Sequence, residues 1–204
     1  MNRILLLLLI STISKTVILS QDWEKELENE KITVFTKKGE EDNIKAYKAY
    51  SFINHPIDDI YKVYVDFDNY YKWFEELEQV KLLSSERNDS TDRFLYYSVV
   101  EFPWLFENRD MFTELTITKS PDVKYTLVSK PVKDSVKYED YVRLENFYQH
   151  TELIKENDNR TKIIMEGKYD AGGNVPAWLM NMFVVESPLN SVVNIENYLT
   201  QLKK

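Results

Sequence analysis

The stretch Gly167-Lys-Tyr-Asp-Ala-Gly-Gly-Asn-Val-Pro-Ala-Trp-Leu179 holds three of the four glycines in this 204-residue chain. In so glycine-poor a sequence, the cluster indicates that the backbone takes a positive φ there or comes very close to another element. Pro176 has a fixed φ and no N–H, which suits the first turn of a helix. The stretch therefore predicts a strand that turns sharply into a C-terminal helix.

The residues upstream of this junction predict a series of strands. Side chains alternate in character over short segments that end in polar turns, a pattern typical of half-buried strands. Because consecutive strands are joined by short turns, we expect an antiparallel sheet. The expected strands are residues 31–38, 44–53, 77–85, 93–101, 109–118, 123–130, 138–153 and 161–169.

Other segments favour helix. Residues 23–30 are short, charged and helix-prone, and a helix is expected to begin near His55, followed by a short helical turn at residues 68–74. Beyond the glycine cluster we expect a helix at residues 176–185, and a second one with Ser187 as its N-cap. The fold class is therefore α+β, with a curved antiparallel sheet packed against a long C-terminal helix.

Residues 1–20 have the pattern of a cleavable export signal. A short basic start precedes a leucine-rich run, and the small residue Ser20 ends the segment. Lys15 interrupts the apolar stretch, which disfavours a stable transmembrane helix. We expect residues 1–20 to be removed and residues 21–204 to form one exported domain, periplasmic or extracellular, with no stable transmembrane span.

The charge and the residue types limit the partners. Removal of residues 1–20 takes away two basic residues and no acidic one, which leaves 24 basic and 34 acidic residues. A net charge near −10 argues against nucleic acid or an anionic membrane surface as a partner. The chain has no cysteine, so disulfides and thiol catalysis are excluded. We expect a monomer.

Four segments resemble the START-type lipid-transfer domains and their helix-grip, Bet v 1-like relatives. They are residues 66–73 (DFDNYYKW), 103–110 (PWLFENRD), 141–143 (YVR) and 170–181 (DAGGNVPAWLMN), and their order and spacing match the family over residues 22–203. The resemblance implies a strongly curved antiparallel sheet wrapped around a long C-terminal helix. It also implies an interior tunnel for one hydrophobic ligand, often a lipid or sterol, that is gated by loops near that helix.

The family's Arg-Asp pair falls on Arg109 and Asp110 at the start of a strand. Adjacent strand residues point to opposite faces, so these two side chains cannot pair with each other and each needs another partner. We favour a structural role for both, with ligand contact as the alternative. Gly172, Gly173 and Pro176 form the expected hinge, where close approach serves either packing or a moving lid.

The candidate ligand-binding residues are apolar and polar side chains of the expected strands and terminal helix. Trp73, Met111, Met165, Trp178 and Met182 are candidates for apolar lining, with core packing as the alternative for each. Arg143 would share a strand face with Tyr141, Glu145, Phe147 and Gln149, and this face lines either a wet tunnel or the solvent side of the sheet.

Tyr96 is the other polar candidate, because a buried hydroxyl can both donate to and accept from a ligand head group. In several lipid-transfer relatives this part of the strand carries an acid that pairs inside the cavity with an arginine one strand on. Here Tyr96 occupies the first region, and Leu115 beside Glu114 occupies the second. This departure argues against a sterol-type polar contact.

Catalytic and metal-binding patterns are absent from the sequence. His55 and His150 have no metal-ligand spacing, and no Gly-x-Ser-x-Gly elbow, phosphate loop or dinucleotide fingerprint occurs. Adjacent carboxylates such as Glu75 and Glu76 indicate solvated charge on a helix. We therefore expect no metal, cofactor or catalytic residue.

Three functions remain, and the first is favoured. The first is non-enzymatic binding or transport of a hydrophobic small molecule, such as a lipid. The second is a cyclase- or aromatase-like enzyme, for which Glu101, Arg143 and Tyr96 are the candidate acid or base groups. The third is an interaction module whose own aromatic side chains fill the interior.

Overall fold

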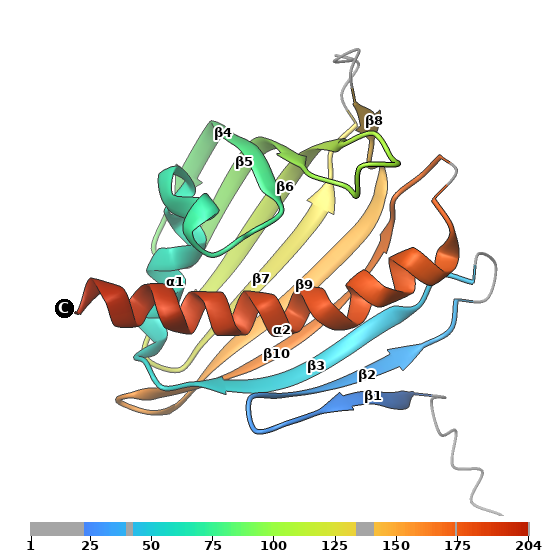
Figure 1. The fold of residues 1–204 in the computed structure, drawn as a ribbon. Helices are drawn as coiled ribbons and strands as arrows, with labels where there is room; N and C mark the ends of the chain where they lie inside the picture. The colour runs from blue at the N-terminus through green and yellow to red at the C-terminus, as the bar shows by residue number, and fades with distance from the viewer. Residues whose placement is uncertain (1–22, 40–42, 134–140, 174, 204) are drawn as a thin grey trace, which may run out of the picture.

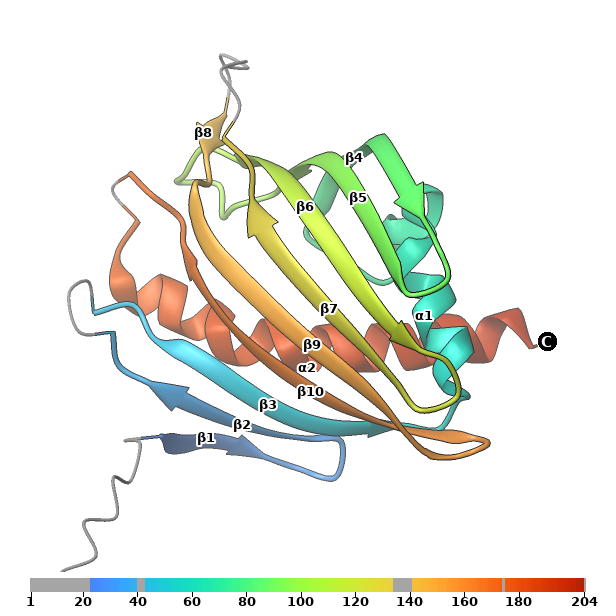
Figure 2. The same ribbon diagram turned by 180° about the vertical axis from the view of Figure 1, so that it is seen from behind.

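The computed structural model describes residues 23–39, 43–133, 141–173 and 175–203, so the expected export signal at residues 1–20 lies outside the described residues. The described chain forms one large sheet with helices on its concave face (Figures 1 and 2). Its strands are β1 (Glu24–Glu28), β2 (Ile32–Lys37), β3 (Ala46–Ile53), β4 (Leu77–Arg87), β5 (Thr91–Val100), β6 (Arg109–Ser120), β7 (Lys124–Pro131), β8 (Val142–Arg143), β9 (Asn146–Asn157) and β10 (Arg160–Asp170).

The sheet runs in the order β1-β2-β3-β10-β9-β7-β6-β5-β4, and β8 pairs with β6. All neighbours on this path are antiparallel, and the β6–β8 pair is parallel. Pairing of β3 with β10 brings the N-terminal strands beside the last strand, and the expected curved antiparallel sheet is confirmed. The helices are α1 (Ile57–Val65), the 3-10 helix η1 (Phe67–Lys72) and α2 (Ala177–Leu202), which lies across the concave face (Figure 1).

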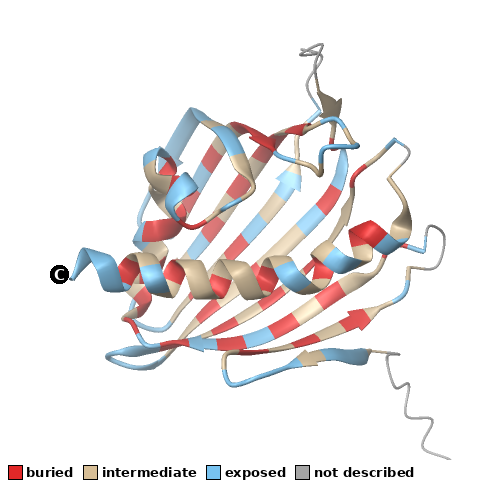
Figure 3. Ribbon diagram, in the orientation of Figure 1, coloured by how far each residue is buried: buried red, intermediate tan, exposed pale blue. Residues whose placement is uncertain are grey.

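Buried residues alternate with more exposed ones along β2, β3 and β10, because successive side chains point to opposite faces (Figure 3). The inward-facing residues form a main core, and the C-terminal part of α2 adds Val192, Ile195 and Leu199 to it together with the apolar face of α1. A smaller cluster forms around Ala171 and Met180 at the start of α2. The sheet and α2 therefore meet through a large core at one end and a small one at the other.

The glycine cluster serves both of the purposes that the sequence indicates. Gly172 and Gly173 have φ values of +64° and +62°, in the left-handed region. Gly167 lies within β10, where an added Cβ would stand 2.9 Å from both the carbonyl oxygen of Tyr148 and the ring of Tyr47. The turn into α2 therefore needs positive φ, whereas the strand before it needs close approach.

Three local expectations were wrong. The charged segment at residues 23–30 forms β1, because pairing with β2 outweighs its helical preference. The strand expected at residues 138–153 is interrupted between Arg143 and Asn146, which gives β8 and β9. Ser187 is not an N-cap, because α2 continues through the buried Pro188; packing against the core compensates for the hydrogen bond that a mid-helix proline loses.

Candidate functional site: a cavity under the C-terminal helix

A cavity lies between the concave face of the sheet and α2. It has a volume of about 180 Å³, which is room for about six water molecules at their liquid density. Its wall comes from strands β3, β5, β6, β7, β9 and β10, from the segment at residues 73–77, and from the middle of α2. This space argues against the reading in which the chain's own aromatic side chains fill the interior.

Most of the wall is apolar or aromatic. Tyr169 of β10 stacks between Tyr47 and Phe147. Its ring centre is 6.4 Å from that of Tyr47 and 6.0 Å from that of Phe147. Tyr96 of β5 lies against the rings of Phe67 and Tyr70, and burial raises the pKa of Tyr96 to about 12. The tyrosine hydroxyls of the wall are therefore neutral at physiological pH and act as hydrogen-bonding groups rather than as charges.

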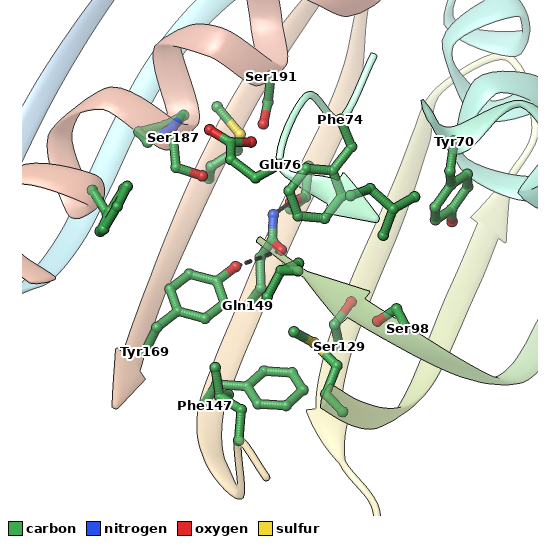
Figure 4. Close-up of a pocket in the computed structure, with 18 of the residues that line it drawn as sticks. Tyr70, Phe74, Glu76, Ser98, Ser129, Phe147, Gln149, Tyr169, Ser187 and Ser191 are labelled. Atoms are coloured by element: carbon green, nitrogen blue, oxygen red, sulfur yellow. Dashed lines mark hydrogen bonds between the residues drawn. The ribbon is translucent and has the colours of Figure 1, made fainter. Parts of the chain in front are cut away.

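One polar pair lies on the floor of the cavity (Figure 4). The hydroxyl of Tyr169 donates to Oε1 of Gln149 at 2.7 Å, and Nε2 of Gln149 is 3.5 Å from Oγ1 of Thr151. Ser98 and Ser129 line the cavity from β5 and β7. Among the described residues, the buried indole N–H of Trp73, on the same wall, has no hydrogen-bond partner. The wall thus offers a few polar groups in a largely apolar surrounding, as in ligand-binding cavities generally.

The side of the cavity near residues 73–77 carries two carboxylates. Glu76 points into the cavity on the side where α2 carries Ser187 and Ser191 (Figure 4). Glu101 lines the same cavity, and its backbone N–H donates to the carbonyl of Glu76 at 2.7 Å. The expectation of a helix was wrong for Glu76, which lies half-buried in a turn before β4 and lines the cavity.

Four of the eight candidate ligand-binding residues line this cavity, namely Trp73, Tyr96, Met111 and Met165. Trp178 and Met182 lie outside the lining, because they project from the outer side of α2 and are exposed. Tyr141 is also outside and packs against the separate cluster of Tyr97, Val99 and Phe112.

Arg143 also lies outside the lining, although Phe147 and Gln149 of the same expected face line the cavity. The break between β8 and β9 ends the alternation that would have placed them together. Instead, Nε and Nη2 of Arg143 each donate to the carboxylate of Asp110 at 2.8 Å. This two-pronged contact holds β8 against β6, and Asp110 is only 1% exposed.

Arg109, at the start of β6, connects the loop between β5 and β6 with the loop between β10 and α2. Its Nε donates to the carbonyl of Ala171 at 3.1 Å and its Nη2 to that of Gly172 at 3.4 Å. Its guanidinium also lies 4.4 Å from the ring centre of Phe102. Burial lowers the pKa of Arg109, and the carbonyl and ring contacts replace the water that the cation has lost. Arg109 and Asp110 therefore have different partners, as expected from their adjacent positions.

Two further features of the described residues bear on the kind of site. No group of three or more His, Cys, Asp or Glu side chains in the described ranges is arranged to hold a metal ion. No helix within the described part of the chain is long and apolar enough to cross a membrane.

The comparisons with known proteins agree with this geometry. The family model of the START domain matches residues 14–199. The fold is similar to a STAR-related lipid transfer protein from Xanthomonas axonopodis, with a TM-score of 0.76 and 23% identity over 87% of this chain and 98% of that one. It is also similar to human StAR-related lipid transfer protein 5, with a TM-score of 0.76 and 12% identity over 91% and 89% of the two chains.

A more distant similarity is to the Zhui aromatase/cyclase from Streptomyces sp. R1128. The TM-score is 0.50 and the identity 12%, over 78% of this chain and 95% of that one.

Proposed function

Because this chain belongs to the START domain family, we propose that it binds or transports one hydrophobic small molecule, such as a lipid, without changing it chemically. The observation that carries the proposal is the largely apolar cavity under α2. Burial of a ligand there contributes about 0.8 kcal/mol for each CH₂ group removed from water. The few polar groups of the wall, among them Gln149 and Tyr96, orient the ligand rather than supply most of its affinity.

We further propose that the chain acts outside the cytoplasm and meets membranes through apolar contact. Trp104 and Leu105 lie in the β5–β6 loop, and Trp178 and Met182 lie near the start of α2; all four are exposed, Trp104 by 89% and Trp178 by 68%. The ring of Phe102 packs 5.8 Å from that of Phe183, which brings this loop and α2 together at the cavity. A negatively charged chain is repelled by anionic lipids, so these side chains suit a zwitterionic bilayer.

Extraction of a bound compound tests the proposed function. We expect protein purified from the cells that produce it to release a stoichiometric hydrophobic compound into organic solvent, detected by mass spectrometry. Ser129→Phe should abolish this compound because the added ring fills the cavity. The matched variant Val128→Phe, whose position on the same strand is exposed and outside the lining, should keep it. Repeated recovery of no compound from the unaltered protein would contradict the proposal.

An enzyme of the aromatase/cyclase kind is the second candidate, because Glu101 is a carboxylate at the wall of the cavity. The same extraction separates the two functions. For this purpose the released compound is added back to the purified protein, incubated for a prolonged time and extracted again. A carrier returns this compound with its mass unchanged. An enzyme returns a product, and Glu101→Gln should abolish the product while retaining binding.

A further inference from the structure

The charged groups of the cavity are all of one sign. Of the described residues that line it, Glu76 and Glu101 are the two that carry a charge at neutral pH, and none is lysine, arginine or histidine. A cavity with charge of one sign and low-dielectric walls concentrates its electric field on whatever enters. The lining therefore discriminates between head groups by charge.

These two carboxylates differ from the acids of the core. Asp110 is paired with Arg143, and Asp92, which is fully buried, accepts from Lys119 at 2.8 Å. Neither Glu76 nor Glu101 has an ion-pair partner among the described residues. Glu101 is exposed and Glu76 is half-buried, so water solvates both carboxylates and no described protein cation neutralises them. A cation on the ligand would complete the pair.

The neighbouring groups also suit a cation. Ser187 and Ser191 lie on α2 toward the side from which Glu76 projects, and their hydroxyl oxygens can accept hydrogen bonds (Figure 4). The aromatic ring of Phe74 lines the same part of the wall (Figure 4), and ring faces attract ammonium groups. An anionic head group would meet two like charges at this place, and the nearby guanidinium of Arg109 is already held by the carbonyls of Ala171 and Gly172.

We propose that the cavity selects an apolar molecule with a positively charged amine head group, which lies between Glu76 and Glu101 while the apolar part extends along the aromatic wall. This inference rests on the proposed function and specifies its ligand class. Molecules with the same apolar chain and an anionic head group are excluded from the cavity, and neutral ones bind with intermediate strength.

A three-way competition tests the head-group preference. The full chain is incubated at neutral pH with equal amounts of oleylamine, oleyl alcohol and oleic acid, which share one chain and differ in head-group charge. The protein is separated from free probe by gel filtration, and the retained probes are quantified by mass spectrometry. We expect oleylamine to exceed oleyl alcohol by about tenfold and oleic acid to be the least retained.

Two double variants assign the preference to the cavity. Glu76→Gln/Glu101→Gln should bring the ratio of oleylamine to oleyl alcohol close to one. Glu75→Gln/Glu78→Gln removes the same net charge from exposed neighbours outside the lining and should leave the ratio unchanged. Comparison of these two separates local pairing from the effect of overall charge.

The outcomes distinguish the inference from the function beneath it. Retention of oleyl alcohol or oleic acid at or above the level of oleylamine overturns the head-group inference and leaves the proposed function standing. An amine preference that survives Glu76→Gln/Glu101→Gln also overturns it. Retention of none of the three probes overturns both. If the first double variant fails to fold, the order of the three probes on the unaltered chain still decides.

Discussion

The two halves of α2 on either side of Pro188 meet different surroundings. After Pro188, the helix buries Val192, Ile195 and Leu199 in the main core. Before Pro188, Met180 and Val184 border the cavity, and Val184 also belongs to the main core. The first half thus covers space that a ligand can occupy, and the second half anchors the helix on a filled core.

The two ends of the molecule are also held together differently. We call the end at α1 and η1 the filled end, and the end at the β5–β6 loop and the start of α2 the cavity end. The filled end relies mainly on apolar packing between α1, η1 and the sheet, to which the buried pair of Asp92 and Lys119 adds a polar contact. At the cavity end, Arg109 bonds the loop after β10 and Arg143 pairs with Asp110. A region that must leave room for a ligand cannot rely on a dense core, so directional polar contacts keep its loops in place.

Loss of the polar contact at the cavity end should have the largest effect. We expect Asp110→Ala to lower the free energy of unfolding by about 3 kcal/mol or more, because it leaves Arg143 without its buried carboxylate partner. Glu114 lies on β6, like Asp110, and forms an exposed ion pair with Lys130 of β7. Glu114→Ala breaks this pair and should cost about 1 kcal/mol or less. Urea titration measures both. Equal losses would show that polar contacts do not hold this end.

The two kinds of glycine should differ in cost. Gly167→Ala places a Cβ against the backbone of Tyr148 and the ring of Tyr47, so we expect a loss of about 2 kcal/mol. At Gly172 an added Cβ meets only ordinary van der Waals contacts at 3.9 Å, but φ stays at +64°, so we expect Gly172→Ala to cost about 1 kcal/mol. Gly172→Asn should cost less than Gly172→Ala, since asparagine tolerates this conformation better. A reversed order of the two alanine variants in thermal unfolding would contradict the assignment.

Identical truncations on the two sides of Pro188 compare the halves of α2 directly. Val192→Ala removes two methyl groups from the filled core, and about 2 kcal/mol of unfolding free energy should be lost. Val184 belongs to the same core cluster but also borders the cavity, so Val184→Ala should cost about half as much, about 1 kcal/mol. The same urea titration checks both. Similar costs would indicate that the cavity end is packed as tightly as the filled end.

Membrane contact at the cavity end should show the smallest effect. Trp104→Ala and Trp178→Ala are each expected to weaken binding to phosphatidylcholine vesicles by a factor of about five, because each removes one exposed aromatic side chain. Tyr50→Ala, at an exposed position of β3, is the control and should leave binding unchanged. Vesicle flotation measures all three. Equal weakening by all three variants would contradict a membrane-facing cavity end.

Much of the fold could be predicted because its signals are local. Alternation along β2 and β5 and the turn residues between strands need no knowledge of distant contacts. The glycine cluster likewise marks the turn into α2. Among the misassigned segments, β1 is an edge strand whose conformation depends on pairing with β2. Local preference does not report that pairing.

The site could be predicted less completely. Met111, Met165 and Tyr96 lie on strands that the sequence predicts, and each lines the cavity. The position of Arg143 was predicted wrongly because the strand is interrupted between β8 and β9, which changes the face on which its side chain lies. Glu76 was missed because its role depends on α2, far along the sequence, closing over it. Alternation identifies residues that share a face, and tertiary packing decides which face is enclosed.

Amide hydrogen exchange with and without oleyl alcohol tests most directly whether a hydrophobic molecule occupies the cavity end. The neutral head group makes this measurement independent of the preference for amines. We predict that the probe slows exchange in residues 101–108 and 171–186 and leaves residues 192–202 unchanged, because those residues already rest on a filled core. Slowed exchange at residues 192–202, or no change anywhere, would contradict the account.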